Sequence, residues 1–166
     1  DQILSMASEA LQDALEELMK MRVQEGKALE SDLKGKCRQL SQWLEKVRVE
    51  SDGLITHYRQ VLLRNLKEAD LELDLDDTRI LKEIALFADR CDISEEITRI
   101  DSHLGQFLED LQADGMLGRK LDFILQEVNR EFNTIGAKGN HLEITRAVIE
   151  SKNEIERMRE QLQNVE

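Results

Sequence analysis

The chain contains no proline and few aromatic residues, and both shortages restrict its fold class. Aromatic residues make up 4% of the 166 residues and charged residues 35%. Leu, Ile, Glu, Gln, Lys and Arg dominate instead, a composition typical of long helices packed on one another. The sequence therefore predicts an all-α fold of long helices and helical hairpins.

Long apolar runs, a secretory signal and cysteine motifs are also missing. No apolar run approaches the roughly 20 residues needed to span a bilayer, and the amino terminus lacks the regions of a signal peptide. We therefore expect a soluble, cytoplasmic protein with no membrane partner.

Cys37 and Cys91 lie within helical patterns without CxxC spacing, which favours reduced thiols over a disulfide or zinc site. The absence of HExxH and of a Gly-rich phosphate loop argues against zinc hydrolases and P-loop enzymes.

The net charge of −12, taken alone, argues against a nucleic-acid partner. Nearly all of the excess lies in residues 66–117, which carry 5 basic and 15 acidic groups, whereas residues 118–166 carry 8 and 9. An acidic block is most often a solvated face. The alternative is a site where Mg²⁺ or Mn²⁺ offsets the carboxylates and bridges to phosphate.

Apolar spacing predicts two domains. From residue 2 to about residue 70 apolar residues recur every three or four positions, so residues 1–70 are expected to form a long helical arm. Glycine weakens a helix, and we expect a bend near residues 51–53. Residues 71–77, LELDLDD, predict a connector whose last residue, Asp77, caps the next helix. Residues 71–166 then form a second helical domain.

Four helices are predicted in this second domain. The first covers residues 78–89, and the next starts with Asp92 as its cap and Glu95 completing a capping box. The third follows Gly118 and ends in residues 136–140. The last carries a heptad stripe, which favours an antiparallel hairpin with the preceding helix. The stripe consists of Ile144, Val148, Ser151, Ile155, Met158, Leu162 and Val165.

One side of the helix after Asp92 carries a polar edge that we call the acid–base edge. Its residues are Glu96, Arg99, His103, Gln106 and Asp110. The edge gathers acids, a base that titrates near neutrality and a fixed cation, which suffices for general acid–base work on a phosphodiester. The alternative is a surface ion pair between Glu96 and Arg99 beside a histidine without a role.

A second polar edge, the amide edge, lies on the helix that follows Gly118. Its residues are Asp122, Gln126, Asn129 and Asn133. Asn in mid-helix costs a few tenths of a kcal/mol relative to Ala, so we expect a group outside the helix to use these side chains. A polar network between helices or subunits is an equally good interpretation. We expect the two edges to face one groove, completed where necessary by a neighbouring copy.

Charged residues surround the amide edge. Arg119 and Lys120 lie in the first turn of this helix and Lys138 follows it. Cations that flank amides suit a sugar–phosphate backbone, with the amides left to read hydroxyls or base edges. Glu127 and Glu131, one turn apart, are placed to hold a hard divalent ion between them.

Three stretches resemble a known family. Residues 91–107, CDISEEITRIDSHLGQF, residues 118–140, GRKLDFILQEVNREFNTIGAKGN, and the final REQLQNVE resemble the carboxyl-terminal half of the bacterial YicC/YloC endoribonucleases. The resemblance covers most of residues 77–166 in order, and residues 1–70 weakly. It implies a metal-dependent cytoplasmic endoribonuclease, using Mg²⁺ or Mn²⁺, that assembles as a hexameric ring around its RNA.

Position by position, the resemblance points to Glu96, Arg99 and His103 in the first motif, and to Asp122, Gln126, Glu127, Asn129, Arg130, Glu131, Asn133 and Lys138 in the second. With the flanking cations Arg119 and Lys120 added from the residue chemistry, we assign three sets of expected roles. Catalytic roles fall to His103, Glu96, Arg99 and Glu127. RNA-binding roles fall to Arg119, Lys120, Gln126, Asn129, Arg130, Asn133 and Lys138. Metal-binding roles fall to Asp122, Glu127 and Glu131.

The sequence departs from the family pattern in two respects, at Gly139 and His141 and in its missing amino-terminal domain. Gly139 and His141 stand where the family more often has a small polar residue and an acid, and both are left out of the site. His57 also lacks chemically useful neighbours in the sequence. The family's amino-terminal α/β domain is missing and the chain opens on Asp1, so we expect a fragment that binds or assembles without necessarily cutting.

The resulting prediction is an endoribonuclease that cleaves single-stranded RNA during RNA processing or decay. Its expected partners are RNA and further copies of itself, with a hexamer in the full-length protein and no DNA. Two alternatives stay open: a non-catalytic helical module for oligomerisation, and an adaptor that binds RNA without cutting it.

Overall fold

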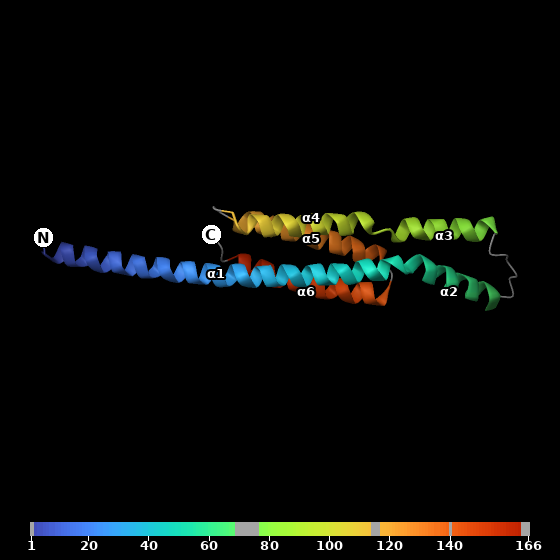
Figure 1. The fold of residues 1–166 in the computed structure, drawn as a ribbon, viewed down its shortest axis with the longest axis horizontal. Helices are drawn as coiled ribbons and strands as arrows, with labels where there is room; N and C mark the ends of the chain where they lie inside the picture. The colour runs from blue at the N-terminus through green and yellow to red at the C-terminus, as the bar shows by residue number, and fades with distance from the viewer. Residues whose placement is uncertain (1, 69–76, 114–116, 140, 164–166) are drawn as a thin grey trace. The chain divides into compact units, whose positions relative to one another are not determined.

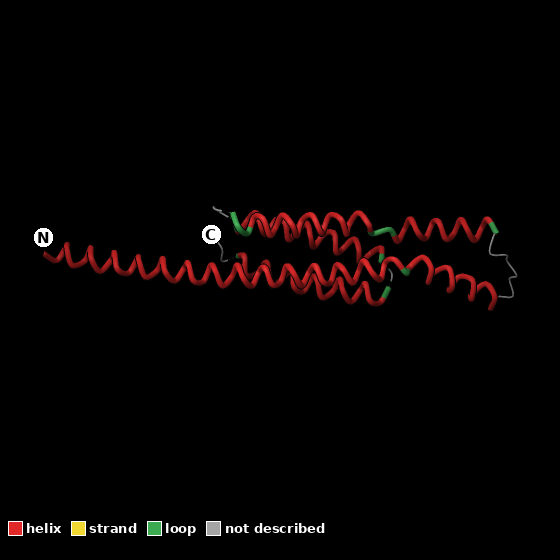
Figure 2. Tube along the Cα trace, in the orientation of Figure 1, coloured by secondary structure: helices red, strands yellow, loops and turns green. Residues whose placement is uncertain are grey.

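A computed structural model of the chain describes residues 2–68, 77–113, 117–139 and 141–163, and these form six helices (Figure 1). They are α1 (Gln2–Asp52), α2 (Leu54–Glu68), α3 (Thr78–Cys91), α4 (Ser94–Asp110), α5 (Gly118–Lys138) and α6 (Leu142–Leu162). Figure 2 shows helices joined by short loops over these ranges, with no strand in them. The predicted all-α fold is confirmed. No helix in the described ranges is long and apolar enough to cross a membrane.

The chain divides into two compact units, Asp1–Lys36 and Cys37–Glu166. The described part of the first unit is the amino-terminal portion of α1, whose apolar side chains are largely exposed. They include Ile3, Leu4, Met6, Leu11, Leu15, Leu18, Met19, Met21 and Val23. The predicted domain boundary between residues 70 and 71, and all of the predicted connector except Asp77, lie outside the described residues.

The interruption between α1 and α2 falls at Gly53, within the stretch where the sequence predicts a bend. Helical hydrogen bonding resumes at once, because the His57 N–H donates to the Gly53 carbonyl at 3.0 Å. Glycine favours an interruption here because its backbone loses more entropy in a helix than that of any other residue.

The second unit is organised around α5, which packs against α4 and against α6. The carboxyl-terminal part of α1 joins this core, since the Cys37 thiol lies 3.8 Å from the Leu104 carbonyl oxygen and Arg48 pairs with Asp101 at 2.5 Å. Burial raises the pKa of the Cys37 thiol to about 11. Each buried aliphatic contributes about 1.5–3 kcal/mol, so the apolar stripes of these helices determine their packing.

Helices α5 and α6 form the predicted antiparallel hairpin, and the heptad stripe of α6 is buried in it. The described members Ile144, Val148, Ser151, Ile155, Met158 and Leu162 are all buried. Val165, the last predicted member, lies outside the described residues.

Two predicted helix starts have different outcomes. The Asp77 carboxylate accepts a hydrogen bond from the Arg79 N–H at 2.8 Å, which confirms the predicted cap of α3. Hydrogen bonds from Arg79 lower the pKa of Asp77 to about 2. Asp92 accepts from the Ser94 N–H at 2.9 Å, but Ile93 occupies the N-cap of α4 and the Glu95 carboxylate pairs with Arg99. The predicted capping box is therefore wrong, because α4 begins too late for Glu95 to reach back.

Two glycines give a matched test of this packing. A Cβ at Gly139, which closes α5, would lie 2.7 Å from Ile144 Cγ2 and 2.9 Å from the Ile135 carbonyl oxygen, whereas a Cβ at Gly105 in α4 would meet open space. We expect Gly139→Ala to lower the free energy of unfolding by about 1–3 kcal/mol. Gly105→Ala should raise it by up to about 1 kcal/mol. Urea unfolding measures both, and equal midpoints for the two variants would contradict the contact at Gly139.

Candidate functional site

Three ion pairs connect α4 to α5 and define the register between them. They are Asp110–Lys120 at 2.6 Å, Arg99–Glu131 at 3.4 Å and Glu96–Lys138 at 2.7 Å. The partner on α5 moves back along the chain as the residue on α4 moves forward, so the two helices run antiparallel. We call this line of side chains the α4–α5 seam. It contains most of the acid–base edge.

The register places His103 level with Glu127. His103 follows Arg99 by one helical turn, and Glu127 precedes Glu131 by one turn. Both side chains are half-buried, and neither belongs to the three ion pairs that cross the seam. The Glu127 carboxylate lies 3.9 Å from the Arg130 guanidinium. An imidazole at the level of a carboxylate, on a partly exposed seam, is an arrangement suited to proton transfer.

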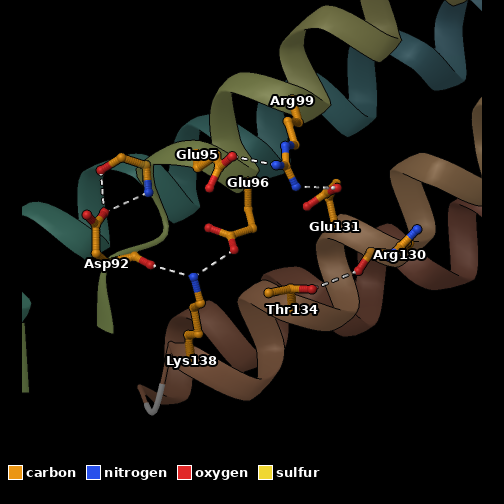
Figure 3. A network of polar contacts seen from close by, with 9 residues as sticks. Asp92, Glu95, Glu96, Arg99, Arg130, Glu131, Thr134 and Lys138 are labelled. Atoms are coloured by element: carbon orange, nitrogen blue, oxygen red, sulfur yellow. Dashed lines mark hydrogen bonds and ion pairs between the residues drawn. The ribbon is translucent and has the colours of Figure 1, made fainter. Parts of the chain in front are cut away.

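At one end of the seam a carboxylate is buried against a lysine (Figure 3). The side chain of Glu96 is 7% exposed, and its Oε1 accepts a hydrogen bond from Lys138 Nζ at 2.7 Å. Lys138 Nζ also donates to the Asp92 carbonyl oxygen at 3.0 Å. Lys138 thus ties the end of α5 to the start of α4, and this contact directs its ammonium toward Glu96.

One turn further along α4, Arg99 lies between two carboxylates, as Figure 3 shows. Its guanidinium pairs with Glu95 on its own helix and with Glu131 on α5. The side chain of Glu131 is only 7% exposed, whereas that of Arg99 is 53% exposed. Arg99 therefore neutralises a buried carboxylate and still presents part of its guanidinium to solvent.

The amide edge begins against α6. Asp122 Oδ1 accepts a hydrogen bond from Arg159 Nε of α6 at 2.8 Å, and its Oδ2 accepts from Gln126 Nε2 at 2.7 Å. The bond to Asp122 raises the pKa of Arg159. Asn129 Oδ1 is buried with no hydrogen-bond partner among the described residues, and Asn133 is exposed.

Among the described residues of one chain, the amide edge and the acid–base edge do not share a groove. Successive helical residues are rotated by about 100°, so Asp122 and Asn129 lie on one flank of the apolar face of α5 and Glu127 and Glu131 lie on the other. The contacts agree, because Asp122 is held by α6 and Glu131 by α4. A groove that joins both edges requires a group from outside the described part of this chain.

The predicted metal ligands are also split between the two flanks of the apolar face of α5. Glu127 and Glu131 lie on the flank that faces α4, Glu131 is paired with Arg99, and Asp122 is paired with Arg159 on the other flank. Among the described residues, no group of three His, Cys, Asp or Glu side chains is placed to hold a metal ion. The three side chains therefore do not fit a shared cation in a single chain.

The predicted RNA-binding cations fall into two groups. Lys120 and Lys138 are engaged in ion pairs across the α4–α5 seam. Arg119 is exposed, and Arg130 is 76% exposed on the outer surface of α5. The arginines are therefore the better placed of the four to meet a phosphate backbone.

Sequence reasoning gave no role to His57 or His141, yet the structure brings them together. Their ring centroids lie 6.4 Å apart in an edge-to-face arrangement. The two residues are far apart in the sequence and lie on different helical elements, so no local pattern signals the contact.

Comparison with known proteins gives two findings. The family model described as "Endoribonuclease YicC-like, C-terminal" matches residues 47–166. A curated protein of Clostridioides difficile (strain 630), named "Probable endoribonuclease YicC", is 41% identical over 169 residues, covering 100% of this chain and 57% of that protein. A protein of Haemophilus influenzae (strain ATCC 51907 / DSM 11121 / KW20 / Rd) with the same name is 36% identical over 157 residues, covering 95% and 54%. The chain spans a little more than half the length of these relatives.

Proposed function

The chain belongs to the YicC-like endoribonuclease family, and from this membership we propose that it takes part in the endonucleolytic cleavage of single-stranded RNA. One observation carries the proposal: the α4–α5 seam holds His103 level with Glu127 between ion pairs that hold the two helices in register. A phosphodiester that lies along this seam meets a base, an acid and a cation within about two helical turns.

In the proposed reaction His103 accepts the proton of the attacking hydroxyl, either a water molecule or the ribose 2′-OH. The P–O5′ bond breaks as the new P–O bond forms, and the departing 5′ oxygen takes up a proton from solvent water. Glu127 stabilises the imidazolium that forms at His103. The exposed part of the Arg99 guanidinium offsets the charge that develops on the phosphate oxygens.

The strand is held by groups outside the seam. Arg119 and Arg130, exposed on α5, contact phosphates without reading sequence. The exposed amides Gln126 and Asn133 contact sugar hydroxyls or base edges on the other flank of the helix. Asn129, whose side chain is half-buried, belongs to the same edge.

Dependence on Mg²⁺ or Mn²⁺ is part of the proposal and rests on the family resemblance and on the spacing of Glu127 and Glu131. The three predicted ligands do not converge within the described part of one chain, so the proposed proton transfer uses protein side chains alone. A hexameric assembly and a cytoplasmic location are likewise proposals. The exposed apolar residues of α1 between Ile3 and Val23 support self-association.

A second candidate function is a non-catalytic helical module that oligomerises or delivers RNA. The same exposed apolar side chains favour it, since a helix that leaves them in water gains stability when another helix covers them. This candidate needs no chemistry at the α4–α5 seam.

Incubation of the chain with a short 5′-labelled single-stranded RNA separates these functions. We expect shortened products with Mn²⁺ or Mg²⁺, fewer products with a chelator, and little cleavage of duplex RNA or single-stranded DNA. RNA binding without cleavage products would support the adaptor function and contradict the nuclease function. An assembly module predicts neither binding nor products, together with a sedimentation coefficient that rises with protein concentration.

A further inference from the structure

A pocket of about 270 Å³ opens where α2, α3 and the start of α6 meet, on elements that do not contribute to the α4–α5 seam. It is lined by Leu54, His57, Tyr58, Val61, Phe87, His141 and Leu142. Two imidazoles, a phenol ring, a phenyl ring and three aliphatic side chains thus surround one small space. The volume is below the roughly 300–1,000 Å³ of pockets for drug-sized ligands, so it suits one flat ring system.

Two stacked rings form a flat wall of this pocket. Tyr58 of α2 and Phe87 of α3 lie 3.6 Å apart at the ring centroids with an interplanar angle of 3°. The Tyr58 hydroxyl donates to Glu83 Oε1 at 3.3 Å, and Arg90 binds the same oxygen at 3.1 Å. The ring pair is therefore anchored from α3, which preorganises the wall for another aromatic ring.

The two histidines add polar edges to this apolar space. His57 comes from α2, and His141 occupies the N-cap position of α6, where its side chain makes no capping hydrogen bond. Instead the His141 imidazole lines the pocket, with its Nδ1 3.6 Å from the Glu50 carboxylate. A neutral imidazole offers one N–H donor and one acceptor nitrogen, the complement of the mixed donor and acceptor edges of a nucleobase.

Two of the three helices around the pocket, α2 and α3, are basic in a chain whose net charge is −12. Helix α2 carries Arg59, Arg64 and Lys67 against one acidic residue, a net charge of +2. Helix α3 carries three basic and two acidic residues, a net charge of +1, whereas α4 carries one and five, a net charge of −4. A helix of net positive charge that also lines an aromatic pocket is a combination with which proteins bind single-stranded nucleic acid.

We propose that this pocket binds one unstacked nucleobase of single-stranded RNA, with the phosphate backbone held along α2. The proposal rests on the RNA substrate of the proposed function and adds a base-binding subsite remote from the α4–α5 seam. The base stacks in the aromatic space beside Tyr58 and Phe87, and its polar edge meets the imidazoles of His57 and His141. The acidic α4 contributes nothing to this contact, because it does not line the pocket.

Fluorescence anisotropy with labelled oligoadenylate tests the proposal, with an abasic ribose-phosphate oligomer of the same length as the probe of charge alone. The test variant is His57→Ala combined with His141→Ala. We expect its Kd for oligoadenylate to rise by roughly five- to hundredfold, the effect of losing the hydrogen bonds from both imidazoles to the base, with no change for the abasic oligomer. Thr56→Ala, exposed on the same helix and outside the pocket lining, is the matched control and should bind like the parent chain.

Two further variants keep the test decisive. Tyr58→Phe retains the stacked ring and should bind oligoadenylate almost as well as the parent. His57→Ala alone changes an exposed side chain, so it reports on the pocket if the double variant fails to fold. An unchanged Kd in His57→Ala, or equal affinity of the parent chain for the abasic oligomer, would overturn the proposal.

The binding test of the pocket and the cleavage test of the proposed nuclease can fail separately. RNA binding that depends on the pocket, without products, would sustain the subsite and remove the proposed nuclease. Products formed with an unchanged Kd in the pocket variants would sustain the nuclease and remove the subsite.

Discussion

Replacement of His103 by alanine is expected to slow RNA cleavage by about 100-fold or more, the usual contribution of a positioned general base. The physical reason is the register of the α4–α5 seam, which places this imidazole level with Glu127 on a partly exposed surface. Single-turnover cleavage of the labelled single-stranded RNA measures the effect. Gln106→Ala, on the same edge of α4 but without an assigned role, serves as the matched control and should cleave normally.

Glu127→Ala should reduce the rate in the same assay, and the double variant should be little slower than His103→Ala. Groups that act as one unit give non-additive effects, and the shared level of the two side chains predicts such behaviour. If the double variant cleaves at the parent rate, neither residue takes part in the reaction. That result would contradict the proposed proton transfer at the seam.

Lys138→Met is expected to lower the free energy of unfolding by about 3 kcal/mol, the low end of the cost of removing one partner from a buried ion pair. The change removes the ammonium group that pairs with the Glu96 carboxylate, whose side chain is only 7% exposed. We expect a loss at the lower limit of that range because the lysine side chain is itself 36% exposed. Urea unfolding measures the loss, and Arg130→Met, at an exposed position of the same helix, should stay within about 0.5 kcal/mol of the parent.

A double-variant cycle identifies the origin of the effect. Adding Glu96→Leu to Lys138→Met removes the stranded charge and should recover much of the lost stability, because replacement of both partners by apolar groups is often neutral. If Glu96→Leu fails to recover stability, the lysine acts through another contact, such as its hydrogen bond to the Asp92 carbonyl. A large loss of stability would also show that reduced RNA affinity in Lys138 variants is no evidence for a phosphate contact.

Local patterns predicted most of the fold. The absence of proline and the regular apolar spacing predicted the helices, and the Asp77 cap was readable because its hydrogen bond joins residues two apart. Helix α3 runs two residues beyond its predicted end at residue 89. The capping box failed because it requires the cap three residues before Glu95, whereas Ile93 is the N-cap of α4 and Glu95 pairs with Arg99.

The candidate site was predicted only as a set of helix edges. The sequence placed His103 and Arg99 on one edge of α4, and Glu127 and Glu131 one turn apart on α5. It did not indicate that Lys138 turns back to Glu96, or that Asp122 is held by Arg159. Their assigned catalytic, RNA-binding and metal-binding roles stay predictions.

The sequence by itself determined that this protein is a set of amphipathic helices with two polar edges, because helical periodicity relates residues three and four positions apart. Only the tertiary structure decided which flank of α5 meets α4, and that His57 and His141 share a pocket. The apolar face of α5 has a polar flank on each side, so two packings are compatible with its sequence. The choice depends on long-range contacts such as Arg99–Glu131, which no local spacing encodes.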